Sequence, residues 1–519
     1  MTTSSPLSRA VVVACAACLL CVPALWNGLP FFYPDTPTYL RGAQMATSQV
    51  AKRLWPTQAD RREIAPAAMQ DAAAPSTTPP AARGLTSVQD KIVLAGRSIY
   101  YGGLLHAAHG AGSVWLGVIA QALCVAAVLH LVMVTLWRVR PAAYLATMAA
   151  LSLTTPLAVY SGLLMPDVFA GLTILGLATL AVYWRQLSRM ARAALAGVLL
   201  FGLLAHASHV AVAAVLLLGV LALRRWNPRW QGVSAPALVL VAACIGVTLA
   251  AEWGFAAGVQ RAVGAAPLRL PYPTARLIEM GPGTRFLQAR CPEAGYAVCA
   301  YAANYPTAWD AFLFSDDPAR GSFALADADS KRRIVAQQGG FVRDVIAYDP
   351  AGVLTGWAVD LGRQLLSFRV DVWSFGDQQL AMYEGRLPPQ TLQAMQASKG
   401  LNAPVYNRVL SALTYASTGA AVLLGVWWAW RRRAGAPARV PQRLEQVAAL
   451  VLAGVAANAL VCVTAASSLD RFQSRVIWLL PFLALTVLAG CASRSRAAET
   501  ADLPGSPGPG LRRLEGAAS

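Results

Sequence analysis

Apolar runs long enough to cross a membrane recur along most of this chain, and they constrain its fold more than any other feature. A helix of roughly 17 to 25 residues crosses a hydrocarbon core about 30 Å thick, because a helix satisfies its own backbone hydrogen bonds in lipid. About ten such runs occur in the sequence, although some are short by that measure. They predict helical spans near 9–26, 112–136, 142–162, 167–184, 193–207, 209–223, 235–256, 408–430, 446–466 and 474–491.

Composition agrees with a membrane protein. Hydrophobic residues make up 56% of the 519 residues and charged residues only 13%, which is too apolar for an ordinary soluble domain. The runs at 193–207 and 209–223 are short for two crossings. However, "RQLSRMAR" before them and "RRWNPR" after them are both basic, so the positive-inside rule places both on the cytoplasmic side with an even number of crossings between them. The expected fold class is an all-α polytopic membrane protein.

Charge distribution predicts the orientation of the spans. The positive-inside rule places Arg138, Arg140, the Arg431–Arg433 run, Arg494 and Arg496 in the cytoplasm together with both termini. The net charge of +18 follows mainly from this topology. No basic patch interleaved with aromatic residues lies on a soluble segment, so no nucleic-acid partner is expected. The expected location is a bacterial inner membrane, whose outer side faces a periplasm.

The spans and their connections divide the chain into four parts. The middle of the first outer loop, "APAAMQDAAAPSTTPPAARG", is rich in Ala and Pro and predicts a flexible insertion. Residues 9–26 could instead be a signal peptide, since Val22-Pro23-Ala24 loosely fits a cleavage site. The predicted parts are a seven-span module at 1–257 with the outer loop 27–111, a periplasmic subdomain at 258–407, a three-span module at 408–493 and a disordered cytoplasmic tail at 494–519.

Two cysteines lie outside the apolar runs. In "CPEAGYAVC", Cys291 and Cys299 bracket a short turn on the expected oxidising side of the membrane. This placement favours a disulfide over two free thiols.

Polar side chains gather at the outer ends of the predicted spans. The middles of the spans hold almost no ionisable residue apart from His130, which weighs against a transporter, because transporters place such groups near the midplane. The outer groups are Asp35 after the first span, Arg97, Tyr100, His106 and His109 before the second, Asp167 between the third and fourth, His206 and His209 at the next outer turn, and Asp470, Arg471 and Arg475 at the last.

The order of these motifs resembles the GT-C class of polyprenyl-phosphate-sugar-dependent glycosyltransferases, which includes protein mannosyltransferases and lipid A aminoarabinose transferases. "YPDTPTYL" places the acid Asp35 and the aromatic Tyr39 at the start of the first outer loop, and "GRSIYYGGLL" returns with an arginine and tyrosines. "DRFQSRVIWLLP" supplies arginines and then a proline at the final outer turn. The resemblance covers about 1–230 and 440–491.

The resemblance implies a polyprenyl-phosphate sugar donor and contacts to substrate from Tyr39, Arg97 and Tyr100. Two features depart from the class. Asp35 is followed by Thr36 where a second acid is common, and His206 and His209 stand in a turn that often carries a lysine.

Transfer of a sugar from a lipid phosphate needs a base for the acceptor proton and cations for the departing phosphate. Asp35, at a membrane rim beside cations, suits the first role, although Asp-Thr-Pro is also good turn chemistry. Asp167 is a second candidate acid, but it also stands where a helix N-cap would, directly before an apolar run.

The cationic and imidazole groups also allow two interpretations each. Arg471 and Arg475 lie four residues apart, so they can share one helical face as a phosphate clamp, or they can extend toward lipid headgroups. His206 and His209, with a carboxylate, could hold a divalent metal. Hydrogen bonding to a sugar or phosphate is the preferred interpretation, and no metal or other cofactor is expected.

Together these features predict an inverting GT-C-type glycosyltransferase that moves a sugar from a polyprenyl-phosphate donor to a lipid, glycan or protein acceptor. Two other classes remain. A polymerase or ligase of O-antigen would place its critical groups in the loop 258–407, and a lipid or solute transporter would need a polar path through the spans.

Overall fold

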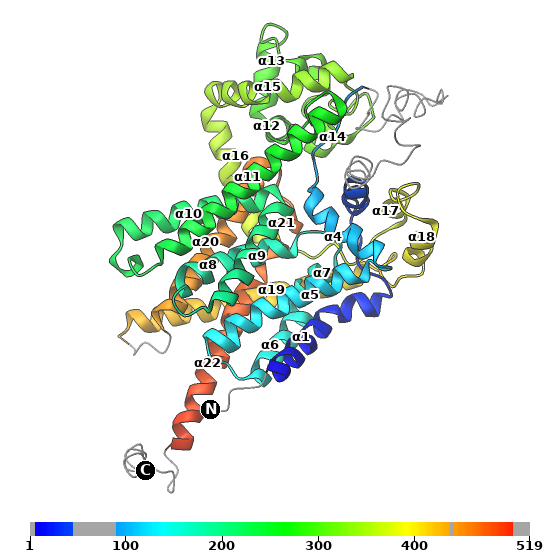
Figure 1. Cartoon of the computed structure of the whole chain (residues 1–519). Coiled ribbons are helices and arrows are strands. Elements are labelled where there is room, and N and C mark those ends of the chain that lie inside the picture. The colour runs from blue at the N-terminus through cyan, green and yellow to red at the C-terminus, as the bar shows by residue number, and fades with distance from the viewer. Residues whose placement is uncertain (1–5, 45–89, 436–440, 502–519) are drawn as a thin grey trace.

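The computed structural model describes residues 6–44, 90–435 and 441–501, and in this part of the chain helices are the regular secondary structure (Figure 1). Strand-like pairing there is limited to three isolated bridges. The prediction of an all-α fold is therefore confirmed. The helices are α1 (Pro6–Asn27), α4 (Ile99–Gly110), α5 (Trp115–His130) continued by the π-helix η3 (Leu131–Leu136), α6 (Pro141–Thr154), α7 (Leu157–Gly162), α8 (Val168–Tyr183), α9 (Arg189–Ala205), α10 (Ala207–Trp226), η4 (Pro228–Trp230), α11 (Ala235–Val263), α12 (Tyr272–Met280), α13 (Pro282–Arg290), η5 (Ala297–Asn304), α14 (Trp309–Phe314), α15 (Ala328–Tyr348), α16 (Pro350–Leu366), α17 (Asp377–Ala381), α18 (Pro389–Gln396), α19 (Pro404–Arg433), α20 (Gln442–Ala465), α21 (Asp470–Ile477) and α22 (Leu479–Ala501).

Seven helical segments of the described residues are long and apolar enough to cross a membrane. They are α1, α5 with η3, α10, α11, α19, α20, and α21 with the start of α22. The chain is therefore a membrane protein by length and composition of its helices. The other three predicted spans contain shorter helices: α6 has 14 residues, α8 has 16 and α9 has 17. The predicted span 142–162 is interrupted at Thr155 and Pro156, which separate α6 from α7.

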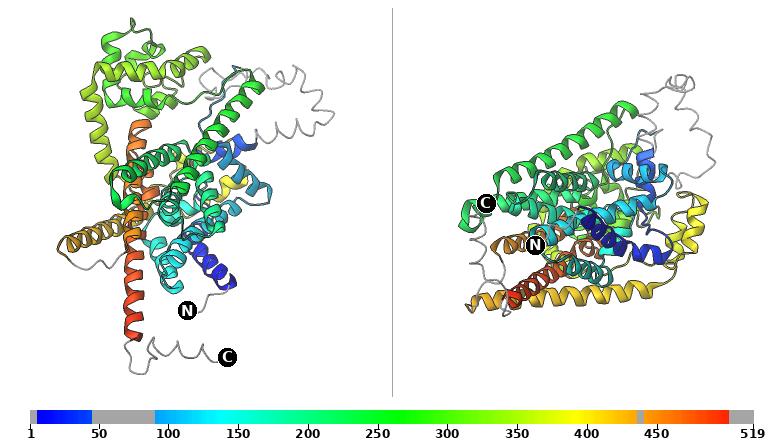
Figure 2. Two further views of the ribbon diagram at one scale, coloured as in Figure 1. Left: turned by 60° about the vertical axis from the view of Figure 1, so that its left-hand side comes forward. Right: turned by 60° about the horizontal axis from the view of Figure 1, so that its bottom comes forward.

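The helix α8 forms the centre of the bundle. All 16 of its residues are buried, as expected for a helix that is apolar on every side. It packs against α9, α20, α10 and α11, while the two longest helices, α11 and α19, lie on opposite flanks of the bundle (Figure 2, right). The residue that precedes this central helix is Asp167, so the fold places that carboxylate deep among helix ends.

Residues 258–407, expected to form one subdomain, form two separately packed units in Figure 1. The first contains α12 to α15, with a core that includes Phe286, Phe312 and Phe341. The second contains α17 and α18, whose buried Tyr383 and its neighbours pack against Phe32 of the first outer loop. The chain between the two units is fixed to the bundle, and this attachment separates them. The amide of Arg369 donates to Asp470 of α21, and the amide of Val370 donates to Ser411 of α19.

The remaining expectations concern a disulfide and the chain's less regular segments. Cys291 and Cys299 are disulfide-bonded in the first of the two units, as their spacing predicts. The helix α22 continues to Ala501, beyond residue 494 where a tail was expected to begin. The Ala- and Pro-rich insertion of the first loop and residues 502–519 lie outside the described residues.

Candidate functional site

Two loops that carry acidic residues are joined by hydrogen bonds at one end of the bundle. The amide of Phe31 donates to the carbonyl of Gly162 at 3.0 Å, and the amide of Leu164 donates back to Phe31 at 2.9 Å. The hydroxyl of Thr36 then donates to the carbonyl of Leu164 at 3.1 Å. These bonds hold the loop after α1 against the loop before α8. As a result, Asp35 and Asp167 belong to the same site.

A capped helix start brings a cation to Asp35. Ser98 accepts hydrogen bonds from two amides of the first turn of α4 and donates its own to the carbonyl of Leu204 at 2.6 Å, which fixes where α4 begins. Arg97 directly precedes this cap, and its guanidinium lies 2.6 Å from the Asp35 carboxylate. Burial alone would lower the pKa of Arg97, but the charge of Asp35 raises the pKa on balance. The guanidinium therefore stays charged.

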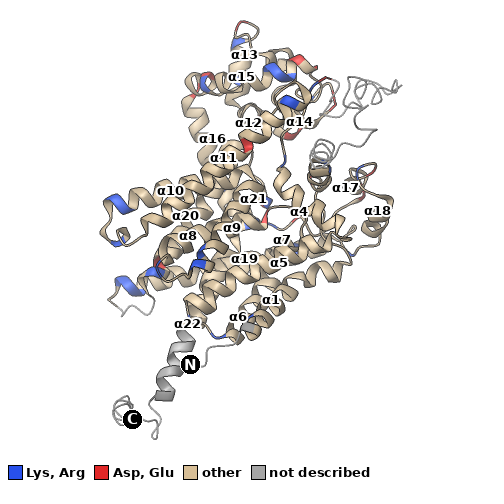
Figure 3. Cartoon of the chain, viewed as in Figure 1, with Lys and Arg blue, Asp and Glu red and all other residues tan. Residues whose placement is uncertain are grey.

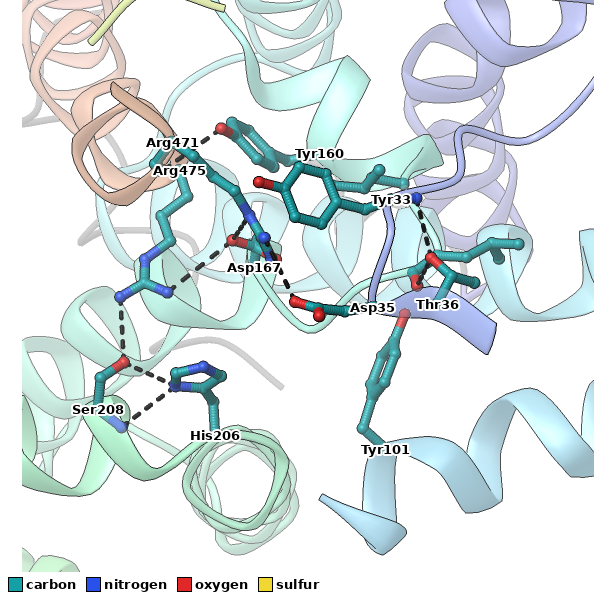
Figure 4. Close-up of polar contacts among 12 residues, drawn as sticks. Tyr33, Asp35, Thr36, Tyr101, Tyr160, Asp167, His206, Ser208, Arg471 and Arg475 are labelled. Carbon is teal, nitrogen blue, oxygen red and sulfur yellow. Dashed lines mark hydrogen bonds and ion pairs between the residues drawn. The ribbon is translucent and has the colours of Figure 1, made fainter. Parts of the chain in front are cut away.

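Arg471 connects the two carboxylates. Its Nε and Nη2 donate to the two oxygens of Asp167 at 3.0 and 2.6 Å, and its Nη1 lies 3.9 Å from Asp35 (Figure 4). The guanidinium also stacks over the ring of Tyr33, with its central carbon 3.8 Å from the ring centroid. A bidentate pair of this kind holds the arginine in one orientation.

Arg475 lies one helical turn further along α21 and supports the same carboxylate. Its Nη1 is 3.9 Å from Asp167, and its Nη2 donates to Asn458 at 2.9 Å and to Ser208 at 3.1 Å. The expectation that Arg471 and Arg475 share a helical face is confirmed, because both reach Asp167 (Figure 4).

Solvent access separates these groups into two sets. The side chains of Asp35 and Arg97 are 25% and 22% exposed, and that of Arg471 is 10% exposed. Those of Asp167 and Arg475 are each only 2% exposed. A ligand can therefore contact Asp35, Arg97 and one edge of Arg471, whereas Asp167 and Arg475 hold the cluster from behind.

The position of Asp167 at the start of a helix agrees with the N-cap interpretation, but its side chain does not cap the helix. It occupies the N-cap position of α8, yet its side chain makes no capping hydrogen bond, because Arg471 takes both of its oxygens. For Asp35, the backbone carbonyl accepts from the amides of Thr38 and Tyr39 at the start of helical residues 36–44, while its carboxylate pairs with Arg97. The backbone of Asp35 thus forms the turn, and its side chain forms the ion pair with Arg97.

The two tyrosines expected to contact substrate both make packing contacts. Tyr39 is only 1% exposed and packs edge-on against Tyr101, with ring centroids 5.2 Å apart. Tyr100 donates its hydroxyl to the carbonyl of Ala251 on α11 at 2.9 Å. Tyr100 thus belongs to the packing around α4, whereas Tyr39, although nearly buried, interacts electrostatically with the charged groups of the site.

The two histidines of the α9–α10 turn also stabilise the site from behind. His206 accepts from the amide of Ser208 at 3.2 Å, and His209 bonds the carbonyl of Gly202 at 2.7 Å. Their rings lie 5.3 Å apart. No group of three histidine, cysteine or carboxylate side chains suited to a metal lies together in the described residues. The observed partners of these imidazoles are hydrogen-bonding groups of the turn itself.

Sequence reasoning missed several residues of the site. Asp371, an exposed residue from the segment between the two outer units, interacts electrostatically with Arg471. Asn458 could have been found from the sequence, because a buried amide side chain in the apolar run of α20 needs a hydrogen-bond partner. Tyr33, Ser208 and Asp371 carried no local signal, because their neighbours in the site come from distant parts of the chain.

Comparisons with protein-family models, with curated proteins and with solved structures find no match for this chain. The chemistry of the site therefore follows from its geometry. The accessible carboxylate of Asp35 can accept a proton, and the guanidinium groups of Arg97 and Arg471 beside it can bind an anion.

Proposed function

We propose that this chain is a GT-C-type glycosyltransferase that moves a sugar from a polyprenyl-phosphate donor to a lipid, glycan or protein acceptor. The observation that carries the proposal is the position of Asp35. Its carboxylate is one quarter exposed and lies between Arg97 at 2.6 Å and Arg471 at 3.9 Å. This position is at the ends of apolar helices, where the phosphate of a membrane lipid would lie.

In the proposed reaction the acceptor hydroxyl attacks the anomeric carbon of the sugar as Asp35 takes its proton. A bond forms between the acceptor oxygen and that carbon, and the bond from the carbon to the donor phosphate oxygen breaks. The polyprenyl phosphate leaves with the bonding electron pair. Because one base and one direct displacement suffice, the configuration at the anomeric carbon inverts.

The cations suit the leaving group in this scheme. Arg97 and the exposed edge of Arg471 would hold the phosphate while its negative charge grows. Asp167 does not contact substrate in this proposal. It positions Arg471, and Arg475 with its bonds to Asn458 and Ser208 keeps Asp167 ionised and in place.

We further infer the topology expected from charge: ten crossings in a bacterial inner membrane, with both termini cytoplasmic and the site on the periplasmic side. An O-antigen polymerase or ligase with its critical groups in 258–407 is less well supported. In that region Arg276 pairs with Asp360 and Arg285 pairs with Asp349, so these arginines serve the packing of their own unit.

The proposal is tested with the purified full chain in lipid nanodiscs and a panel of polyprenyl-phosphate hexoses and pentoses. Release of free polyprenyl phosphate is followed by mass spectrometry. Asp35→Asn should lower turnover by about 100-fold or more and leave donor binding intact, because general-base catalysis typically contributes that factor. Arg471→Lys should weaken donor binding and turnover together, because lysine lacks the bidentate geometry.

Asp349→Asn is the matched control, since it removes a carboxylate that pairs with an arginine far from the rim. It should leave turnover unchanged. Two results would contradict the proposal: no release of polyprenyl phosphate by the wild-type chain with any donor, or wild-type turnover by a correctly folded Asp35→Asn variant.

A further inference from the structure

A cavity lined by arginines lies at the end of the central helix opposite the candidate site. It has a volume of about 410 Å³ and is lined by Arg185, Arg192 and Arg224, together with Trp184 and Ser234. Residue 184 follows the last residue of α8, whereas Asp167 precedes the first, so the 16 residues of α8 separate the cavity from the candidate site by roughly 24 Å. Figure 3 shows basic segments gathered at this end of α8 and α10. The proposed transfer reaction uses none of them.

The arginines of this cavity lack acidic partners in the described part of the chain. Arg192 donates its Nε to the carbonyl of Trp184 at 2.9 Å, and its guanidinium lies over the Trp184 ring at 4.6 Å. These contacts orient the guanidinium without neutralising it. No ion pair involves Arg185 or Arg224 among the described residues, and no described carboxylate lines the cavity. Three like charges around one space favour the binding of an anion.

The start of α11 adds to the positive potential. Ser234 is the N-cap of this 29-residue helix, and its side chain makes no capping hydrogen bond. Of the first two helical residues, Ala235 lines the cavity and carries an amide N–H that the Ser234 side chain does not cap, whereas Pro236 has no N–H. Amides at a helix start interact favourably with phosphate oxygens, and the serine hydroxyl can donate as well.

The surroundings place the cavity at the level of lipid headgroups. It lies at the ends of α10 and α11, two of the helices long enough to cross a membrane. Trp226 at the end of α10 is 78% exposed and Met190 at the start of α9 is 83% exposed. Exposed tryptophan at the end of a span is typical of the membrane–water interface. These features are those expected of a cavity at the level of lipid phosphates, and its volume is within the range of small-ligand sites.

We propose that this cavity binds the phosphate headgroup of an anionic membrane lipid, in the leaflet opposite the candidate glycosyltransferase site. Arg185, Arg192 and Arg224 contact the phosphate oxygens, and Ser234 donates a hydrogen bond from the start of α11. The acyl chains lie against the apolar surfaces of α10 and α11. This proposal does not depend on sugar transfer, so the two proposals are tested separately.

The test uses the purified full chain in detergent, with native mass spectrometry and thermal unfolding as readouts. Phosphatidylglycerol, phosphatidylcholine, inorganic phosphate and glycerol phosphate are each titrated. Phosphatidylglycerol should bind saturably and raise the unfolding temperature. Phosphatidylcholine and the two soluble phosphates should bind at least about 10-fold more weakly, because the first lacks net charge and the others lack acyl chains.

Variants identify the cavity as the place of binding. Arg224→Gln and Arg185→Gln should each weaken phosphatidylglycerol binding by about 10-fold or more, which is the usual effect of losing a charge-assisted hydrogen bond. Arg225→Gln is the matched control, because it removes the same charge from the next residue, which does not line the cavity. It should bind phosphatidylglycerol as the wild type does.

Three results would overturn the proposal. Equal affinity for phosphatidylcholine would show that charge is not recognised, and equal affinity for inorganic phosphate would show that no lipid is required. An equal loss in Arg225→Gln would show a general surface effect. If Arg224→Gln fails to fold, Arg185→Gln decides the question, because Arg185 is an exposed residue in a connection.

Discussion

Replacing Asp167 by asparagine should destabilise the fold, and this prediction separates Asp167 from Asp35. The Asp167 side chain is 2% exposed and accepts two hydrogen bonds from Arg471, with Arg475 3.9 Å away. Asparagine has nearly the same size, so it leaves no cavity. It removes the negative charge and leaves two buried guanidinium groups without their main counter-charge.

The magnitude follows from what the arginines retain. Breaking a buried ion pair typically costs 3 to 5 kcal/mol, because the remaining charge stays buried and unpaired. Arg471 keeps Asp35 at 3.9 Å, and Arg475 keeps Asn458 and Ser208, so the cost should lie near the lower limit. We expect about 3 kcal/mol, which lowers the ratio of folded to unfolded chain about 100-fold.

Asp35→Asn and Asp349→Asn provide the comparison. Both remove a carboxylate from a partly exposed ion pair, and such pairs contribute about 1 kcal/mol or less. Equilibrium unfolding of all three variants in one mixed-micelle system measures the differences. The reasoning would be refuted if Asp167→Asn lowered the free energy of unfolding by less than about 1 kcal/mol, as the other two variants do. The buried ion pairs would then not hold the site in place.

Three further predictions use local features of the structure. Gly102→Ala should destabilise the chain, because the added Cβ would overlap the carbonyl oxygen of Tyr39. In Gly103→Ala the added Cβ meets no atom, so this variant should stabilise α4 by up to about 1 kcal/mol. Thermal unfolding of the two variants checks this, and equal effects would contradict it. Thiol labelling of the denatured chain should reveal two more reactive cysteines after reduction, from Cys291 and Cys299, and the bond should stabilise the outer unit by about 2 to 3 kcal/mol. Tyr296 and Arg343 lower the pKa of Asp344, and Arg285 lowers that of Asp349, below the ordinary 3.8. The stabilising contribution of each ion pair should therefore be complete above about pH 5 and should disappear as the pH falls through the lowered pKa values. Asp344→Asn should flatten this acid limb of a profile of stability against pH, and an unchanged profile would exclude the assignment.

Local patterns in the sequence determined much of the fold. The predicted spans are helical except for the break between α6 and α7, because an apolar run in lipid can satisfy its backbone groups only as a helix. The spacing of Arg471 and Arg475 placed both on one face of α21, since residues four apart lie one helical turn from each other. Cys291 and Cys299 are only eight residues apart, and the turn between them brings their Cα atoms to 5.5 Å, a distance at which a disulfide forms.

Tertiary structure decided which of these groups meet. Asp167 and Arg471 are 304 residues apart, so no pattern near either residue names its partner, and the N-cap interpretation of Asp167 was equally consistent with its neighbours. Tyr39 and Tyr100 stand in suitable motifs, but helix packing directs one against Tyr101 and the other toward α11. Backbone geometry sets the period and length of a helix from adjacent residues, whereas the partners of a side chain at a helix end depend on how distant helices pack. The apolar runs therefore determined the helices of this protein, and only their packing determined which carboxylate is buried as a support and which remains exposed to a ligand.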